Sequence, residues 1–175
     1  MLLTDLPEGL RQGDICSVSA FPRWTAASSS VLVGTSVGLM VEAWDKPIRW
    51  TDDRFLVAIC SYDCDVENPR ARSGILLAPV MPMPAKAGSD REEEILSSNV
   101  AEDGKISYVN LFPLCLPRTD GTSTPAVVDF SAVASMSSAK DAVTELKEHR
   151  HFSLASQTRE EFQIKAALNL YRAGE

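Results

Sequence analysis

The sequence lacks several local motifs that mark common enzyme active sites. It has no glycine-rich phosphate loop, no His-Glu-x-x-His metal motif and no pair of Cys-x-x-Cys motifs. Only two histidines are present. No stretch approaches the roughly 20 uninterrupted apolar residues of a membrane-spanning helix. We therefore predict no cofactor, no bound metal and no membrane association.

Basic residues are outnumbered by acidic ones. Lys and Arg together number 17 and Asp and Glu 24, so the formal net charge is −7. Proteins that hold a nucleic-acid backbone usually carry a positive footprint. The stretch 42–72 is also acidic, with seven acidic and five basic residues. The charge therefore argues against a main role in binding nucleic acid.

Cysteine is too scarce for a disulfide scaffold. The four cysteines, Cys16, Cys60, Cys64 and Cys115, are irregularly spaced in a chain of 175 residues. The first residues include acids and a proline, where a secretory signal would have a basic patch followed by an apolar run. We expect a cytoplasmic protein with reduced thiols.

Hydrophobic residues, at 45% of the chain, are sufficient for one packed core. Apolar runs bounded by Gly, Pro and polar residues predict strands at 14–21, 55–61, 74–80, 106–114 and 126–134, with a hairpin at 30–44. The runs at 55–61 and 74–80 are continuously apolar, which is typical of strands buried on both faces. The segment 81–104 contains prolines and then REEEILSSN, which predicts about two helical turns within a surface insertion.

Helical spacing appears in the last part of the chain. Ala139, Ala142, Val143 and Leu146 follow a cap at Ser138. A second helix is predicted with Thr158 as its cap and an apolar stripe made of Ile164, Ala167, Leu168 and Tyr171.

These elements predict an α+β fold whose antiparallel sheet curls into a small barrel. We expect a single domain, 1–175, with the barrel core at 12–21, 30–44, 54–80 and 105–134, an insertion at 81–104 and a C-terminal helical segment at 138–172.

Two segments together resemble the MazF/PemK ribonuclease toxins. These are QGDICSV near the start, and DRFLVAICSYDCD followed by GILLAPV. The resemblance implies an SH3-like barrel, usually homodimeric, that cuts single-stranded RNA, and it makes 22–51 and 81–105 insertions. It implies Arg54 as the residue that stabilises the charged phosphorane. The family's hydroxyl position falls on Met81 or Pro82, which carry no hydroxyl, so an active site would need another one, such as Ser61 or Ser73.

Arg54 also has a simpler interpretation, as an exposed charge that opens a strand and pairs with Asp52 or Asp53.

The loop from Cys60 to Glu67 combines two thiols with three carboxylates at the end of a predicted strand. Cys60 is expected in the core on the face of Ala58. Asp63 and Asp65 would either bind a hard cation or cap the turn. Cys64, between two aspartates, is a poor nucleophile because negative neighbours suppress the thiolate. We favour a binding surface in which Cys64 and Asp65 fix the shape of the loop.

Three further residues are candidates for binding. Trp24 and Trp44 are large aromatics outside the predicted strands, where such residues anchor partners or pack on the core. Arg150 lies in the basic and aromatic segment 147–152, which either contacts phosphate or complements the C-terminus of a helix.

Three functions remain open. The favoured one is a divergent MazF/PemK-like barrel protein that acts as a protein-interaction component of a bacterial toxin–antitoxin or phage-defence system, with a protein partner or a second copy of itself. The second is an active endoribonuclease that cuts single-stranded RNA using Arg54 and Ser61. The third is a metal-dependent enzyme that uses the Cys60 to Glu67 loop.

Overall fold

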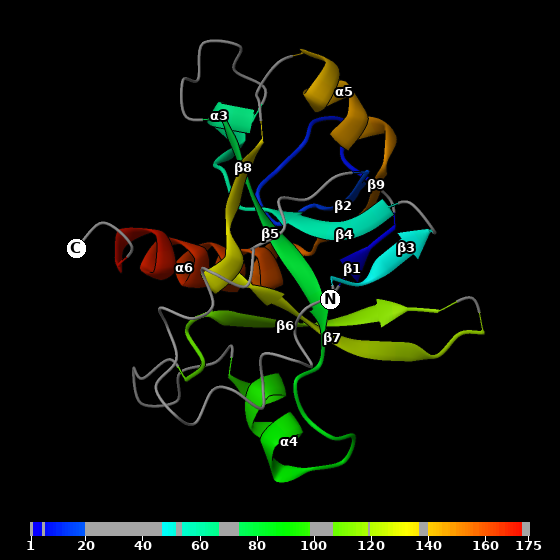
Figure 1. Cartoon of the computed structure of the whole chain (residues 1–175), viewed down its shortest axis with the longest axis vertical. Helices are drawn as coiled ribbons and strands as arrows, with labels where there is room; N and C mark the ends of the chain where they lie inside the picture. The colour runs from blue at the N-terminus through cyan, green and yellow to red at the C-terminus, as the bar shows by residue number, and fades with distance from the viewer. Residues whose placement is uncertain are drawn as a thin grey trace, which may run out of the picture.

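The computed structural model describes residues 2–4, 6–19, 47–51, 54–66, 74–98, 107–118, 120–136 and 140–172. These residues form a mixed α+β fold (Figure 1). The strands are β1 (Leu2–Leu3), β2 (Ile15–Val18), β3 (Arg49–Thr51), β4 (Arg54–Ile59), β5 (Ile75–Pro82), β6 (Leu111–Pro117), β7 (Ser123–Asp129), β8 (Ala134–Met136) and β9 (Arg150–Leu154). The helices are α3 (Asp63–Val66), α4 (Asp90–Ser97), the 3₁₀ turn η1 (Phe130–Ala132), α5 (Lys140–Glu148) and α6 (Ser156–Arg172). The predicted hairpin at 30–44 lies outside the described residues.

The strands pair in the order β1-β9-β2-β4-β5-β7-β6, with β3 on β4 and β8 on β5. All the pairings between described strands are antiparallel. Strand β5 changes partners along its length, from β8 and β4 in its first half to β7 at its end. This strand therefore joins the main part of the sheet to the β6–β7 hairpin, and the described sheet is not closed.

Strands β4 and β5 are buried on both faces, as the sequence predicts. Along β4, Leu56 and Ala58 belong to one hydrophobic cluster and Val57 and Ile59 to another. Cys60 continues the face of Ala58 and is 1% exposed, which confirms its expected place in the core. Side chains alternate across a strand, so one continuous apolar run supplies both clusters.

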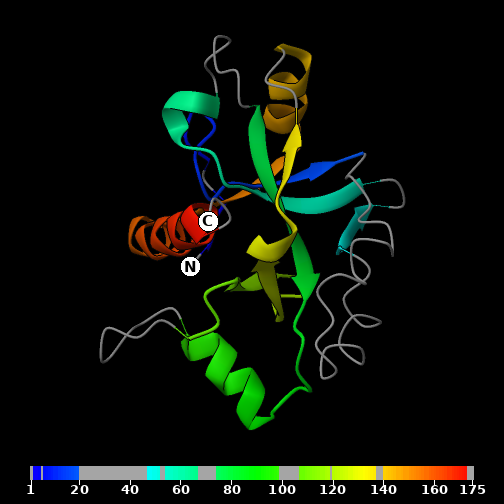
Figure 2. The ribbon, with the colours of Figure 1, turned by 60° about the vertical axis from the view of Figure 1, so that its left-hand side comes forward.

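The helices cover different parts of the sheet. Helix α6 packs Phe162 against Phe112 and Phe130, with ring centroids 5.1 Å apart in both pairs. Helix α5 buries Leu146 in the cluster on the other face. Helices α3 and α5 lie at one end of the molecule and α4 lies at the other (Figure 1, Figure 2).

The predicted helix in the 81–104 insertion is confirmed as α4. Ser89 caps it by accepting a hydrogen bond from the backbone N–H of Glu92, and Glu92 in turn accepts one from the N–H of Gly88. Such reciprocal bonds satisfy amides that the first turn leaves free. Strand β5 runs on to Pro82, so it takes the first residues assigned to the insertion.

The predicted C-terminal helical segment 138–172 needs correction, because β9 lies between its two helices. The N–H of His149 bonds to the carbonyl of Glu145 at the end of α5, and the chain then enters the sheet beside β2. The described part of α5 agrees with the prediction. Its proposed cap, Ser138, lies outside the described residues.

Two predictions for α6 are wrong. The helix begins at Ser156, so Thr158 lies in its first turn and is not its cap. Two residues of its predicted apolar stripe lie on the outer face, since Ile164 is 54% and Leu168 37% exposed. The buried face instead carries Phe162, Ala166 and Lys165, whose ammonium donates to Ser98 Oγ and to the carbonyl of Leu111. Burial lowers the pKa of Lys165 to about 8.

Candidate functional site

Arg54 opens β4 and is held from two directions. Its Nε donates to Ser17 Oγ at 3.1 Å, and its Nη2 donates to the Ser17 carbonyl at 2.7 Å. The same Nη2 donates to Glu145 Oε1 at 2.9 Å. The side chain of Arg54 is 15% exposed and that of Glu145 is 29% exposed. The carboxylate that pairs with Arg54 therefore comes from α5, while Asp52 and Asp53 lie outside the described residues.

His151 lies beside Arg54, and Trp50 packs against His151. His151 Nε2 is 2.9 Å from Ser17 Oγ, so Ser17 links the imidazole to the guanidinium. The ring of Trp50 lies 4.6 Å from that of His151. Burial, and then electrostatic interactions with His149 and Arg54, lower the pKa of His151 below 6.5, so the neutral imidazole predominates at pH 7. Sequence reasoning missed this group because it did not predict β9.

Ser19 completes this group, because its N–H and its hydroxyl both donate to Glu145 Oε1. We call Ser17, Ser19, Trp50, Arg54, Glu145 and His151 the Arg54 cluster. It contains a neutral imidazole and a cation, which are groups used in acid–base chemistry and in binding anions. Its serine at position 17 is fully buried, so Ser17 cannot serve as an accessible nucleophile.

Ser61 lies far from this cluster. It follows the end of β4, whereas Arg54 begins the strand. Seven residues at a rise of about 3.3 Å each place the two roughly 20 Å apart. Ser61 is 6% exposed, and its hydroxyl accepts a hydrogen bond from the N–H of Leu76 at 2.7 Å. The structure therefore does not bring the two predicted catalytic residues together.

The loop after β4 forms the short helix α3. Asp63 accepts a hydrogen bond from the N–H of Gln12 at 2.8 Å and pairs with Arg159 of α6. Cys64 is a free, exposed thiol. Asp63 therefore ties the loop to Gln12 and to Arg159, and the role proposed for Cys64 and Asp65 stays a prediction.

The same loop offers little to a metal. Among the described residues, no three His, Cys, Asp or Glu side chains are grouped closely enough to hold an ion. Burial raises the pKa of Cys60 to about 12, so its thiol stays protonated. Glu67 lies outside the described residues.

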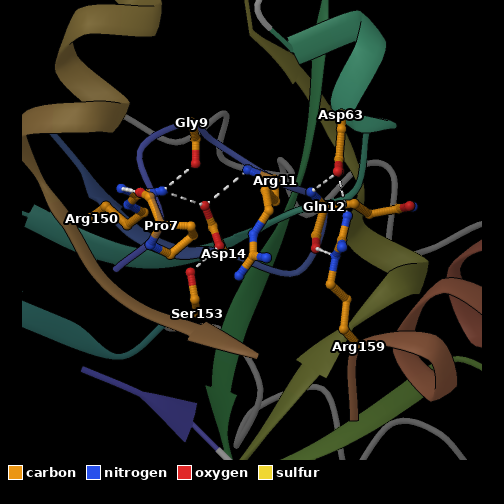
Figure 3. A network of polar contacts seen from close by, with 9 residues as sticks. All are labelled: Pro7, Gly9, Arg11, Gln12, Asp14, Asp63, Arg150, Ser153 and Arg159. Carbon is orange, nitrogen blue, oxygen red and sulfur yellow. Dashed lines mark hydrogen bonds and ion pairs between the residues drawn. The ribbon is translucent and has the colours of Figure 1, made fainter. Parts of the chain in front are cut away.

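Arg150 lies in a second, enclosed network (Figure 3). Its guanidinium donates to the carbonyls of Pro7 and Gly9 and pairs with Asp14 at 3.0 Å. The side chains of Arg150 and Asp14 are only 8% and 1% exposed. Asp14 also accepts from Ser153 and from the N–H of Arg11. Arg150 therefore fastens the first residues of the chain to β9, and the sequence-based alternatives, phosphate or a helix C-terminus, do not describe its contacts.

A turn at Gln12 and Gly13 connects this network to α3. Gly13 has φ +89°, a conformation that side chains rarely adopt, and a Cβ there would approach Leu154 to 2.8 Å. The side chain of Gln12 donates to the carbonyl of Cys60 at 2.7 Å, and its backbone carbonyl accepts from Arg159. The two arginines, Arg150 and Arg159, thus hold adjacent parts of one N-terminal segment.

Two of the predicted binding residues, Trp24 and Trp44, lie outside the described residues. In the described part of the chain, no helix is long and apolar enough to cross a membrane. Comparison with known proteins gave no match to a protein-family model, to a curated protein or to a solved structure.

Proposed function

We propose that this chain is a divergent MazF/PemK-like protein that acts as a protein-interaction component of a bacterial toxin–antitoxin or phage-defence system. Its sheet would be a variant of the SH3-like barrel. The way β5 passes from β4 and β8 to β7 supports that assignment, because one strand shared by two groups of strands gives a strongly bent sheet.

The observation that carries this proposal is the separation of Arg54 from Ser61 along β4. Each polar group also serves the fold: Arg54 is bonded to Ser17 and Glu145, and Ser61 is bonded to Leu76. A phosphoryl-transfer site needs its reacting groups within a few ångströms of one another. A binding role needs no such arrangement.

The end of the molecule at α3 offers a preformed binding surface. Tyr62 is 49% exposed there, directly before the anchored Asp63. Tyrosine supplies a large contact area with little conformational entropy to lose, and it is enriched at interfaces. The ion pair between Asp63 and Arg159 holds the adjoining backbone in place, which lowers the cost of binding.

Co-expression with the products of the neighbouring genes tests this proposal. We expect a stable complex on size exclusion and a Kd by calorimetry that weakens about tenfold or more in Tyr62→Ala, as for an interface anchor. Leu96→Ala is the matched control, since Leu96 is an exposed apolar residue on α4, at the other end of the molecule. The absence of any complex, or equal effects of the two substitutions, would contradict the proposal.

A second function, endoribonuclease activity, is favoured by His151 and Trp50 beside Arg54. The imidazole could move a proton and the indole could stack on a base. Purified protein incubated with single-stranded RNA, with and without EDTA, tests it. Cleavage that persists in EDTA and is lost in both Arg54→Ala and His151→Ala supports this function. Cleavage that EDTA abolishes supports a metal-dependent enzyme instead, and intact RNA excludes endoribonuclease activity.

A further inference from the structure

Strand β1 is a short cover on one edge of β9. Its two residues pair with that edge, Leu2 with Leu154 and Leu3 with Ser153, while the other edge of β9 pairs with β2. An open strand edge offers backbone N–H and C=O groups to any extended segment that can reach it. Each residue pair adds only modestly to the stability of a sheet, so a cover of two pairs costs little to remove.

The opposite end of the strand order is protected in another way. Strand β6 is the last strand there, and it contains Pro113 and Pro117. Proline has no backbone N–H, so neither residue can donate to an added strand. Prolines on edge strands are a common means of preventing pairing between chains. Strand β6 is therefore protected by its own residues, whereas β9 is covered by a separate piece of chain that can leave.

The place that β1 occupies selects an apolar side chain. Leu2 is half-buried and packs against the main core cluster, which includes Phe152 and Leu154. These two residues are 6% and 1% exposed. A segment that replaces β1 must therefore bring an apolar group to the position of Leu2, because otherwise this part of the core would meet water. A charged group there would lose hydration beside an apolar cluster.

The segment that follows β1 has an anchor of its own. Arg150 donates to the carbonyls of Pro7 and Gly9 and pairs with Asp14 (Figure 3). None of these four residues belongs to β1. Strand β1 can therefore leave the sheet while the anchored part of the segment stays in place.

We propose that β1 occupies a strand-addition site on β9, and that the protein partner of the proposed function displaces it with an extended apolar segment of its own. This inference rests on the proposed function and specifies how the partner binds. The added segment runs antiparallel to β9, as β1 does. Its backbone hydrogen bonds supply affinity, and an apolar side chain at the position of Leu2 supplies selectivity. Strand β1 is then an internal competitor, and its departure is part of the cost of binding.

A synthetic peptide that copies residues 1–6, MLLTDL, is the probe. It is titrated into the unchanged protein and into Leu2→Asp, and binding is followed by the amide NMR signals of Ser153 and Leu154. We expect the peptide to bind Leu2→Asp about tenfold more tightly or better, because the carboxylate weakens the internal competitor. Leu96→Asp is the matched control, since Leu96 is an exposed leucine on α4, and it should bind the peptide as the unchanged protein does.

A second peptide tests whether binding is strand pairing. It is N-methylated at Leu2 and Leu3, so it keeps the side chains but cannot donate backbone hydrogen bonds from them, and it should not bind. Three results would overturn the inference: no binding of MLLTDL to Leu2→Asp, equal binding of the N-methylated peptide, or an equal gain in Leu96→Asp. Tighter binding to the unchanged protein than to Leu2→Asp would also overturn it, because the peptide would then add beside β1. If amide spectra show that Leu2→Asp is unfolded, Leu2→Ala replaces it and must show the same direction of change.

The complex obtained by co-expression separates this inference from the proposed function. We expect Leu2→Asp to tighten the Kd for the partner about tenfold, whereas Tyr62→Ala weakens it. A complex whose Kd is unchanged or weaker in Leu2→Asp overturns the strand-addition site and leaves the proposed function standing. If no complex forms, the proposed function fails, and the peptide titration still decides whether β9 accepts a strand in place of β1.

Discussion

Arg54 and Arg150 both pair with a carboxylate, but their surroundings differ. Arg150 is 8% exposed, and its partner Asp14 is 1% exposed. Its remaining bonds go to backbone carbonyls of Pro7 and Gly9. Arg54 and its partner Glu145 are 15% and 29% exposed, and Glu145 belongs to a helix with a single buried residue, Leu146.

The difference separates a structural ion pair from an exchangeable one. Removing water from both charges is costly, so an enclosed pair persists only when its hydrogen bonds are complete, as those of Asp14 nearly are. Replacing one partner of a partly exposed pair lowers the free energy of unfolding less, because water can hydrate the remaining charge or another ion can pair with it. Of these two arginines, Arg150 therefore belongs to the fold, and Arg54 has the more exchangeable partner.

The largest expected effect is that of Arg150→Ala. The substitution leaves Asp14 charged and buried, and it leaves the carbonyls of Pro7 and Gly9 without their donor. We expect the free energy of unfolding in urea to fall by about 3–5 kcal/mol, as for other broken buried pairs. Arg118→Ala is the control, because the pair that Arg118 forms with Asp120 is exposed, and it should change stability by less than about 1 kcal/mol. Similar losses in the two variants would show that Arg150 is not structural.

A smaller effect is expected for Arg54→Ala. The variant loses two bonds to Ser17 and the pair with Glu145, but Glu145 can be hydrated. We expect a loss of about 1–2 kcal/mol in the same urea experiment. Arg54→Lys should restore only part of this loss, since an ammonium cannot reach Ser17 and Glu145 with the planar fork of a guanidinium. A loss as large as that of Arg150→Ala would remove the contrast between the two sites.

The central strands could be predicted from the sequence because their signal is local. Continuous apolar runs identified β4 and β5, and these strands are buried on both faces. Strand β9 was missed because its segment, RHFSL, begins with two basic residues that resemble the end of a helix. In the structure, Arg150 is paired in the interior, which no local pattern indicates.

The face of α6 was mispredicted for a related reason. Ile164 and Leu168 form the more apolar stripe, whereas the buried face includes Lys165. That lysine is acceptable inside because Ser98 and the carbonyl of Leu111 satisfy its ammonium. Phe162 then determines which face of α6 is buried, since it packs against two other phenylalanines. Partners from distant segments settle the orientation, and the sequence alone does not show them.

The candidate site shows the same limit. Arg54 was identified from the sequence, yet Glu145, Ser17 and His151 come from three other elements and carry no motif. The pairing of β2 with β4 and β9 brings Arg54, Ser17 and His151 together, and helix α5 adds Glu145.

The smallest expected effect is a pH dependence that only the Arg54 cluster has, because the Arg150 network contains no histidine among the residues of Figure 3. The pKa of His151 is lowered in the folded protein, so as pH falls through 6.5 the unfolded chain binds a proton that the folded chain does not. The free energy of unfolding must then decrease on acidification from pH 7.5 to 5.5.

His151→Gln, which retains a group able to bond Ser17, should show a weaker decrease over this range in urea unfolding. Glu145 titrates below this window, because its pKa is lowered from 4.5. His149→Gln removes one of the groups that lower the pKa of His151, so it should weaken the decrease less than His151→Gln does. If both variants follow the same pH curve as the unchanged protein, His151 is not the titrating group, and the imidazole beside Arg54 contributes no pH sensitivity to the cluster.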